Sequence, residues 1–148
     1  MFKPIGFVKN NVREKIDHDW GEVNSHIVID ESLKDGLKGL KDFNYIIIVY
    51  HLHQAKFIKE KHLVRHPQGR DDMSKVGIFS QRAKDRPNPI GITTVKLISV
   101  NENIIEVQGL DAIDSTPVFD IKPYYPKYDQ YKDVTVPKWV DILMKDYF

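Results

Sequence analysis

The stretch YIIIVY, residues 45–50, is the longest continuous apolar run of the chain, and its side chains are β-branched or aromatic. Such side chains favour extended backbone, and the run is too short for a typical helix. Strands that lack polar alternation are typically buried on both faces. The run therefore predicts a strand at the centre of the core.

Shorter β-rich runs lie on both sides of this strand. Further strands are predicted at residues 5–8, 25–29, 76–79, 92–100, 104–107 and 118–121. Asn101, Glu102 and Asn103 predict a hairpin turn between two of them. Closing such short strands into a barrel removes the open edges that a small sheet would expose. The pattern indicates a mainly β domain whose sheet is closed or nearly closed.

Two segments carry apolar side chains at helical spacing. After Asp30, a residue type suited to an N-cap, the side chains of Leu33, Leu37 and Leu40 share one helical face. Near the end of the chain the same spacing is repeated by Val140, Leu143, Met144 and Tyr147. We therefore predict a short helix after the second strand and a short amphipathic helix over residues 138–147.

Composition limits the class of protein. The chain has 148 residues, of which 41% are hydrophobic and 29% are charged, with a formal net charge of +1. These values fit one globular domain over residues 1–148, and they do not fit a disordered chain or a polycation. The absence of cysteine excludes disulfide frameworks, zinc ribbons and thiol nucleophiles. No run resembles a signal peptide or a membrane span, so a cytoplasmic location is expected.

Residues 54–75 are polar and basic and show little periodicity. Their cationic side chains are Lys56, Lys59, Lys61, Arg65 and Arg70. A loop of this length inside a small domain is either functional or mobile. Because acidic residues crowd the first quarter of the chain, the near-zero net charge conceals a basic strip over residues 56–86 that could face RNA.

Residues 77–91 read GIFSQRAKDRPNPIG, the densest cluster of polar residues, prolines and glycines in the chain. The two prolines stiffen the backbone, which suits rigid presentation of polar groups. Arg82 and Arg86 offer planar forks for a carboxylate or a phosphate, and Asn88 offers both a donor and an acceptor. The alternative, which composition alone favours, is a surface loop whose prolines only end strands.

Asp111 and Asp114 belong to a second polar stretch, residues 109–117. The two carboxylates could act as a pair in proton transfer or in cation binding. Aspartate and serine also form turns, because their side chains bond the backbone two residues on. The local sequence favours the turn.

Histidines and aromatic residues give weaker signals. His51 and His53 would point to one side of a strand and could share a metal ion with His62 or His66. No third ligand has a diagnostic spacing, so no metal site is expected, and a metal-dependent hydrolase is the weakest functional hypothesis. Stacking on nucleic-acid bases is open to Trp20, Tyr124, Tyr125, Tyr128 and Tyr131, although such residues more often cover a small core.

Several motifs occur together and in a fixed order. They are Ile5-Gly6, Leu40 with Phe43, His53, Phe79 with Arg82 and the block Arg86-Pro87-Asn88-Pro89-Ile90-Gly91, Leu110-Asp111, Asp114, Thr116-Pro117-Val118 and Asp120-Ile121-Lys122-Pro123-Tyr124. In this combination the sequence resembles the TsaA-like family, whose best known members methylate tRNA with S-adenosylmethionine. The resemblance covers about residues 4–126 and leaves residues 127–148 as a C-terminal extension.

The resemblance implies a single-sheeted β-barrel and a homodimer with the cofactor near the subunit interface. It implies an acceptor, the exocyclic amine of a threonylcarbamoyl-adenosine beside the tRNA anticodon. The cofactor contacts that it implies are Leu52, His53, Arg82, Ile92, Asp114, Ser115, Thr116 and Pro117. The residues that it implies for shaping the pocket or meeting the acceptor are Arg86, Asn88, Lys122 and Tyr124. No catalytic base is assigned, and the candidates are Asp111, Asp114 and His53.

The sequence departs from the family pattern at three points, of which the first two bear mainly on the acceptor and the third is a small change. Residues 18–22, HDWGE, stand where many tRNA-modifying members carry a Pro-Arg-Gln segment. The additional C-terminal domain of those members is not expected here, and residues 114–117 read DSTP in place of the usual Asp-Gly-Thr-Pro. The alternatives are therefore a methyltransferase for a small metabolite and a non-catalytic module that binds S-adenosylmethionine.

Overall fold

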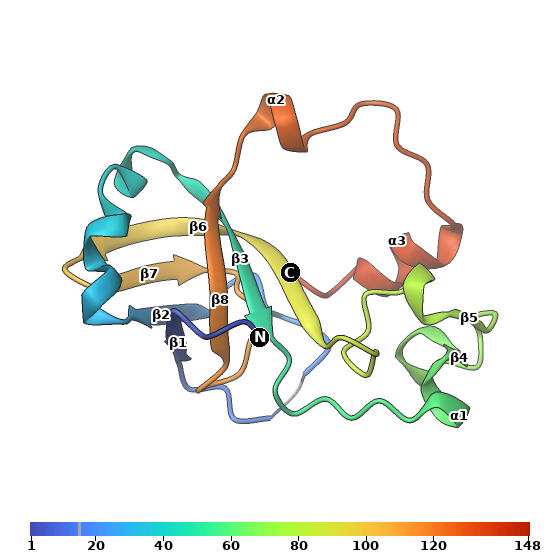
Figure 1. The fold of residues 1–148 in the computed structure, drawn as a ribbon. Helices are drawn as coiled ribbons and strands as arrows, with labels where there is room; N and C mark the ends of the chain where they lie inside the picture. Colours follow the sequence, from blue (N-terminus) through green and yellow to red (C-terminus); the bar gives the residue numbers. More distant parts are fainter. Residues whose placement is uncertain (15) are drawn as a thin grey trace.

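The structure is a computed structural model that describes residues 1–14 and 16–148. Six strands form one closed antiparallel barrel in the order β1-β2-β7-β6-β3-β8, and β8 pairs with β1 to close it (Figure 1). They are β1 Gly6–Lys9, β2 Asn24–Ile29, β3 Tyr45–His51, β6 Ile90–Asn101, β7 Ile104–Gln108 and β8 Pro117–Pro123. The expected mainly β, single-sheeted barrel is confirmed.

The central strand β3 pairs with β6 on one side and β8 on the other. Ile46, Ile48 and Tyr50 point into the barrel and are at most 2% exposed, whereas Ile47 and Val49 are only partly buried. The prediction of burial on both faces was wrong. The outer face of β3 is apolar because it forms the wall of a surface cavity, which Ile47 lines.

The barrel interior is filled mostly by β-branched side chains. Those that are at most 1% exposed include Val8, Ile27, Ile46, Ile48, Val95, Ile105, Val107 and Val118. Burial of each such side chain stabilises the fold by about 1.5–3 kcal/mol relative to leaving it in water. This interior holds the strands in place, and polar groups lie on their outer faces and at their ends.

Turns and helical segments between the strands depart from the sequence expectations in detail. The hairpin between β6 and β7 is confirmed, with Glu102 in the left-handed region at φ 55°. Asp30 accepts a hydrogen bond from the Ser32 backbone N–H at 2.8 Å, as an N-cap does. The helix that follows consists of two 3-10 segments, η1 Glu31–Leu37 and η2 Leu40–Asp42, because Gly39 adopts φ 84° between them.

The chain between β3 and β6 forms an excursion beside the barrel (Figure 1). It contains α1 Lys59–His62, β4 Val64–Arg65, η3 Pro67–Gly69, β5 Val76–Gly77 and η4 Ile78–Ser80. The strand predicted at residues 76–79 is therefore only two residues long and pairs with β4 rather than with the barrel. The buried amide of Gln81 donates to the carbonyls of Arg65 and Val76 at 3.0 and 2.9 Å, which ties this small sheet to the loop that follows it.

After β8 the chain forms α2 Pro126–Asp129, crosses to the excursion and forms α3 Lys138–Met144 (Figure 1). The last residues then return to the barrel. The backbone N–H groups of Asp19 and Trp20 donate to the carbonyls of Asp146 and Tyr147, each at 2.8 Å. Among the residues that the structure describes, no helix is long and apolar enough to cross a membrane.

Candidate functional site

A cavity of about 1140 Å³ lies between the barrel, the loop that carries residues 77–91, and the C-terminal segment. Ile47 and Ile92 line it from the outer faces of β3 and β6, and Arg82 lines it from the loop. Trp139 and Tyr147 line it from the C-terminal segment. Segments distant in sequence therefore converge on one hollow that is larger than the usual small-molecule site of about 300–1,000 Å³.

The arginines of the motif have different surroundings. Arg86 Nη1 donates to the carbonyls of Gln81 and Ala83 at 2.9 and 3.2 Å, so its guanidinium braces the loop from within. Arg82 is exposed, and its Nη2 donates to the carbonyl of Ile92 at 2.5 Å. Of the two, Arg82 is the one that can present N–H donors to an anion in the cavity.

Asp111 is the polar centre of the cavity wall. Its Oδ1 accepts hydrogen bonds from the hydroxyls of Thr93, at 2.5 Å, and Tyr50, at 2.9 Å, and its Oδ2 accepts one from the Tyr147 hydroxyl. Burial raises the pKa of both phenols well above their ordinary value, and the negative charge of Asp111 raises the two pKa values further. Tyr50 and Tyr147 therefore remain protonated donors at neutral pH.

Asp114 lies in a turn, as expected, but its carboxylate holds an earlier segment of the chain rather than the backbone two residues on. Its carboxylate accepts from the Asn10 backbone N–H at 3.0 Å and from the Ser115 hydroxyl at 3.1 Å, and it forms an ion pair with Arg13. These partners, the Asn10 N–H first among them, lower the pKa of Asp114 below its ordinary value of 3.8. Asp111 and Asp114 thus have separate partners and do not act as a carboxylate pair.

We expect Asp114→Asn to lower the free energy of unfolding at neutral pH and to lose that effect in acid. A carboxylate whose pKa is depressed in the folded state contributes stability above its unfolded pKa, and this contribution disappears as the pH falls through the folded value. Urea unfolding of both proteins at pH 7 and below pH 3.8 would measure the difference. A gap of equal size at both pH values would contradict the assignment.

Most of the residues predicted from the family resemblance line the cavity. They are Leu52, His53, Arg82, Arg86, Asn88, Ile92, Thr116 and Tyr124. The predicted residues outside the described lining are Asp114, Ser115, Pro117 and Lys122. Lys122 Nζ is 3.0 Å from a carboxylate oxygen of Asp120 on the same strand. The structure thus brings the motif loop and the end of β3 together, and it leaves most of the 114–117 turn apart from them.

The histidines do not assemble a ligand set. His51 stacks on Phe119 with ring centroids 5.7 Å apart, His62 Nδ1 accepts from the Ile58 N–H, and His66 Nδ1 lies 2.5 Å from the Met73 carbonyl oxygen. Within residues 1–14 and 16–148, no three histidine or acidic side chains are grouped as metal ligands would be.

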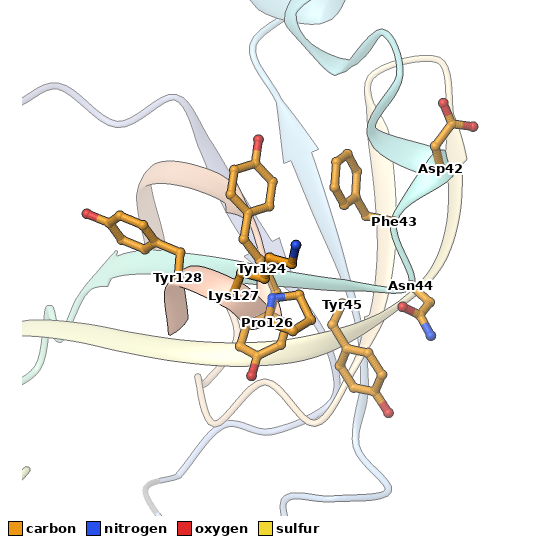
Figure 2. Close-up of a pocket in the computed structure, with 9 residues that line it drawn as sticks. Asp42, Phe43, Asn44, Tyr45, Tyr124, Pro126, Lys127 and Tyr128 are labelled. Carbon is orange, nitrogen blue, oxygen red and sulfur yellow. The ribbon is translucent and has the colours of Figure 1, made fainter. Parts of the chain in front are cut away.

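A second hollow, of about 640 Å³, lies where β3 begins and β8 ends (Figure 2). Aromatic rings line most of it: Phe43, Tyr45, Tyr124, Tyr125 and Tyr128. Tyr125 and Tyr128 are 52% and 78% exposed, and Tyr131 nearby in sequence is 76% exposed, so the expectation that these tyrosines cover the core was wrong. That expectation fits Trp20, which is 3% exposed.

Sequence reasoning did not single out Thr93, Tyr50 or Tyr147 as functional residues. Thr93 is a polar side chain at an inward-facing position of a predicted strand, and this signal could have revealed a buried polar partner. Tyr147 gave no such signal, because its spacing indicated only the apolar face of a helix. Its contact with Asp111 depends on the return of the chain end to the barrel.

Comparison with known proteins gives consistent matches. Residues 17–130 match the family described as the tRNA-methyltransferase O N-terminal domain. A probable S-adenosyl-L-methionine-binding protein of Methanothermobacter thermautotrophicus is 38% identical over 132 residues, covering 86% of this chain and 91% of the relative. A mouse tRNA (adenine(37)-N6)-methyltransferase is 39% identical over 145 residues, covering 92% of this chain and 33% of the relative.

A solved structure agrees with these sequence matches. The crystal structure of TrmO from Pseudomonas aeruginosa superposes with a TM-score of 0.76 at 25% identity, over 94% of this chain and 61% of the TrmO chain. The chain thus spans about three fifths of that protein and a third of the mouse enzyme. The resemblance drawn from the motifs is confirmed, and the chain belongs to the tRNA-methyltransferase O N-terminal domain family.

Proposed function

We propose that this chain binds S-adenosylmethionine in the 1140 Å³ cavity and transfers its methyl group to the N6 amine of an adenosine in tRNA. The observation that carries the proposal is the convergence of Arg82, other residues of the motif loop and Asp111 on one cavity, in a chain of this family. Relatives named as S-adenosyl-L-methionine-binding proteins and as tRNA methyltransferases both support it. The motif resemblance narrows the acceptor to a threonylcarbamoyl-adenosine beside the anticodon.

The residues of the cavity fit this cofactor. Arg82 presents exposed N–H donors, which suit the carboxylate of an amino-acid moiety. Leu52 and Ile92 offer apolar surface to an adenine ring and a thioether chain. The volume of about 1140 Å³ leaves room for part of an acceptor nucleoside beside the cofactor.

When bound, S-adenosylmethionine supplies a methyl group on a sulfonium, which is already activated for displacement. The chain must therefore hold the acceptor nitrogen in line with that methyl group and exclude water. The motif loop suits this task because Pro87 and Pro89 stiffen it and the Pro89 carbonyl accepts from the Leu52 N–H at 2.8 Å. The internal hydrogen bonds of Arg86 further restrict the loop that presents Arg82.

The proposal includes that the protein forms a homodimer. The turn residues Asp114, Ser115 and Pro117 are implied cofactor contacts, yet they lie outside the described lining of the cavity in their own subunit. The Ser115 side chain is exposed and faces away from the barrel interior, where a second copy can meet it. Sedimentation velocity tests this part, since a monomer at micromolar concentration would contradict it.

We expect Arg82→Ala to weaken binding of S-adenosylmethionine by about 10–100-fold, because a charge-assisted hydrogen bond contributes about 1.5–3 kcal/mol. Calorimetry on both proteins measures the change. Arg70→Ala is the matched control, because Arg70 pairs with Asp72 on the excursion and is not among the residues that line the cavity. Equal affinity of wild type and Arg82→Ala would contradict the cofactor assignment.

The acceptor is tested with a radiolabelled methyl group. Incubation of the protein with labelled S-adenosylmethionine and bulk tRNA, followed by mass spectrometry of the nucleosides, is expected to yield an N6-methylated adenosine derivative. Label that enters only the small-molecule fraction of a cell extract would indicate a metabolite methyltransferase instead. Binding of S-adenosylmethionine without transfer to either fraction would indicate a non-catalytic module.

A further inference from the structure

The C-terminal segment, residues 138–148, lies beyond the part of the chain that matches the family, which is residues 17–130. It nevertheless forms one wall of the cavity, through Trp139, Tyr147 and their neighbours. The wall is fixed in place, because the carbonyls of Asp146 and Tyr147 accept from the backbone N–H groups of residues 19 and 20 at 2.8 Å. This segment thus reaches the candidate site from outside the residues that match the family.

The Tyr147 hydroxyl reaches Asp111 and leaves it room for one further partner. An ionised carboxylate is an acceptor only, and each of its oxygens has two lone pairs. Thr93 and Tyr50 both donate to Oδ1, whereas Tyr147 is the donor to Oδ2 among residues 1–14 and 16–148. Since Asp111 is partly exposed and lines the cavity, the remaining lone pair of Oδ2 is the natural place for a donor from a ligand.

We propose that Asp111 is the catalytic residue that receives the N–H of the acceptor amine, and that Tyr147 is the positioning residue that holds its carboxylate toward the cavity. This inference rests on the proposed function and deepens it. The group that Asp111 recognises is an adenine-type exocyclic amine that still carries a hydrogen atom. A fully substituted amine has no N–H to donate and is not recognised in this way.

The proton balance of the transfer agrees with this role. The amine nitrogen uses its lone pair to form the new C–N bond as the C–S bond breaks, and the sulfonium becomes a neutral thioether. The nitrogen, positively charged at that point, releases its proton to the Asp111 carboxylate, which passes it to solvent. Tyr50 and Tyr147 cannot take this proton because they are held protonated, as the raised pKa values of both phenols indicate.

The first test compares Tyr147→Phe with Asp111→Asn in the methyl-transfer assay. Removal of the Tyr147 hydroxyl alone is expected to lower kcat at least about 10-fold, and loss of the carboxylate at least about 100-fold, with affinity for S-adenosylmethionine unchanged. Tyr45→Phe is the matched control, because Tyr45 is 43% exposed and is not among the residues that line the cavity. A Tyr147→Phe enzyme with the kcat of wild type would overturn the positioning role.

The second test needs neither catalysis nor a variant that folds. Calorimetry with S-adenosylhomocysteine present compares N6-threonylcarbamoyladenosine with its N6-methylated form, which has lost the N–H. Wild type is expected to bind the N–H form at least about 10-fold more tightly, since its N–H donates to the Asp111 carboxylate and the methylated nitrogen has no hydrogen atom to donate. Equal binding, or no binding of either nucleoside, would overturn the role of Asp111. Failure of wild type to methylate tRNA would instead overturn the proposed function, whatever the preference between the nucleosides.

Discussion

Replacement of Gly91 by alanine is expected to destabilise the barrel and to abolish most of the methyl transfer. A Cβ at this position would lie 2.5 Å from two ring carbons of Tyr50 and 2.9 Å from its hydroxyl. The ring is buried in the core and cannot retreat freely, so overpacking should cost about 1–3 kcal/mol of unfolding free energy. Any retreat also moves the Tyr50 hydroxyl away from Asp111.

Gly77→Ala is the matched control, because Gly77 opens the same motif and a Cβ there meets nothing within 4 Å. Urea unfolding and methyl transfer are measured on both variants. A double-mutant cycle with Tyr50→Leu separates the contact from other effects, since the cost of alanine at position 91 should fall once the ring is gone. Equal behaviour of the two alanine variants would refute the close approach of Gly91 and Tyr50.

Ile48→Ala should lower the free energy of unfolding by more than Gly91→Ala does. Ile48 lies in the middle of β3 and is 0% exposed, with strands paired on both sides. Truncation of such a side chain leaves a cavity that rigid neighbours cannot fill, at a cost of about 2–5 kcal/mol. Urea unfolding is expected to show a lower midpoint with an unchanged slope.

Ile98→Ala provides the comparison for Ile48→Ala. It removes the same atoms from a barrel strand, but Ile98 is 44% exposed on β6, so the loss of unfolding free energy should be well under 1 kcal/mol. Similar losses for the two variants would mean that β3 is not the centre of the barrel.

The barrel was predictable because its strands carry local signals. The β-branched run at residues 45–50 and the turn at Asn101–Asn103 locate a central strand and a hairpin without any tertiary information. What the sequence could not show is which face of β3 is covered. The outer side chains Ile47 and Val49 are as apolar as Ile46 and Ile48, and their burial differs because closure of the barrel turns only Ile46 and Ile48 into the core.

The excursion was harder to anticipate for a similar reason. Residues 76–77 are strand-like, but their partner is the short strand β4, whose two residues have no recognisable pattern. The short helix expected after Asp30 is present, but it consists of two 3-10 segments. Leu33, Leu37 and Leu40 satisfy helical spacing, yet Gly39 breaks the segment into two 3-10 turns by adopting a left-handed conformation.

The candidate site, too, could be predicted from the sequence only in part. Arg82, Arg86 and Asn88 belong to one stiff loop, so their proximity follows from the sequence alone. Asp111 stood out only as half of a suspected carboxylate pair, because its real partners Tyr50, Thr93 and Tyr147 come from three separate parts of the chain. Such a cluster is a product of topology and has no sequence spacing to reveal it.

The two tryptophans of the chain, Trp20 and Trp139, both line the cavity. Trp20 is 3% exposed and its indole N–H donates to the Ile16 carbonyl at 3.0 Å, whereas Trp139 is partly exposed on α3. A dry, fixed indole emits at shorter wavelength than a hydrated one, and a purine stacked on an indole quenches its emission. The intrinsic tryptophan fluorescence of this protein therefore originates entirely at the cavity, and it gives an optical titration of cavity occupancy without any attached dye.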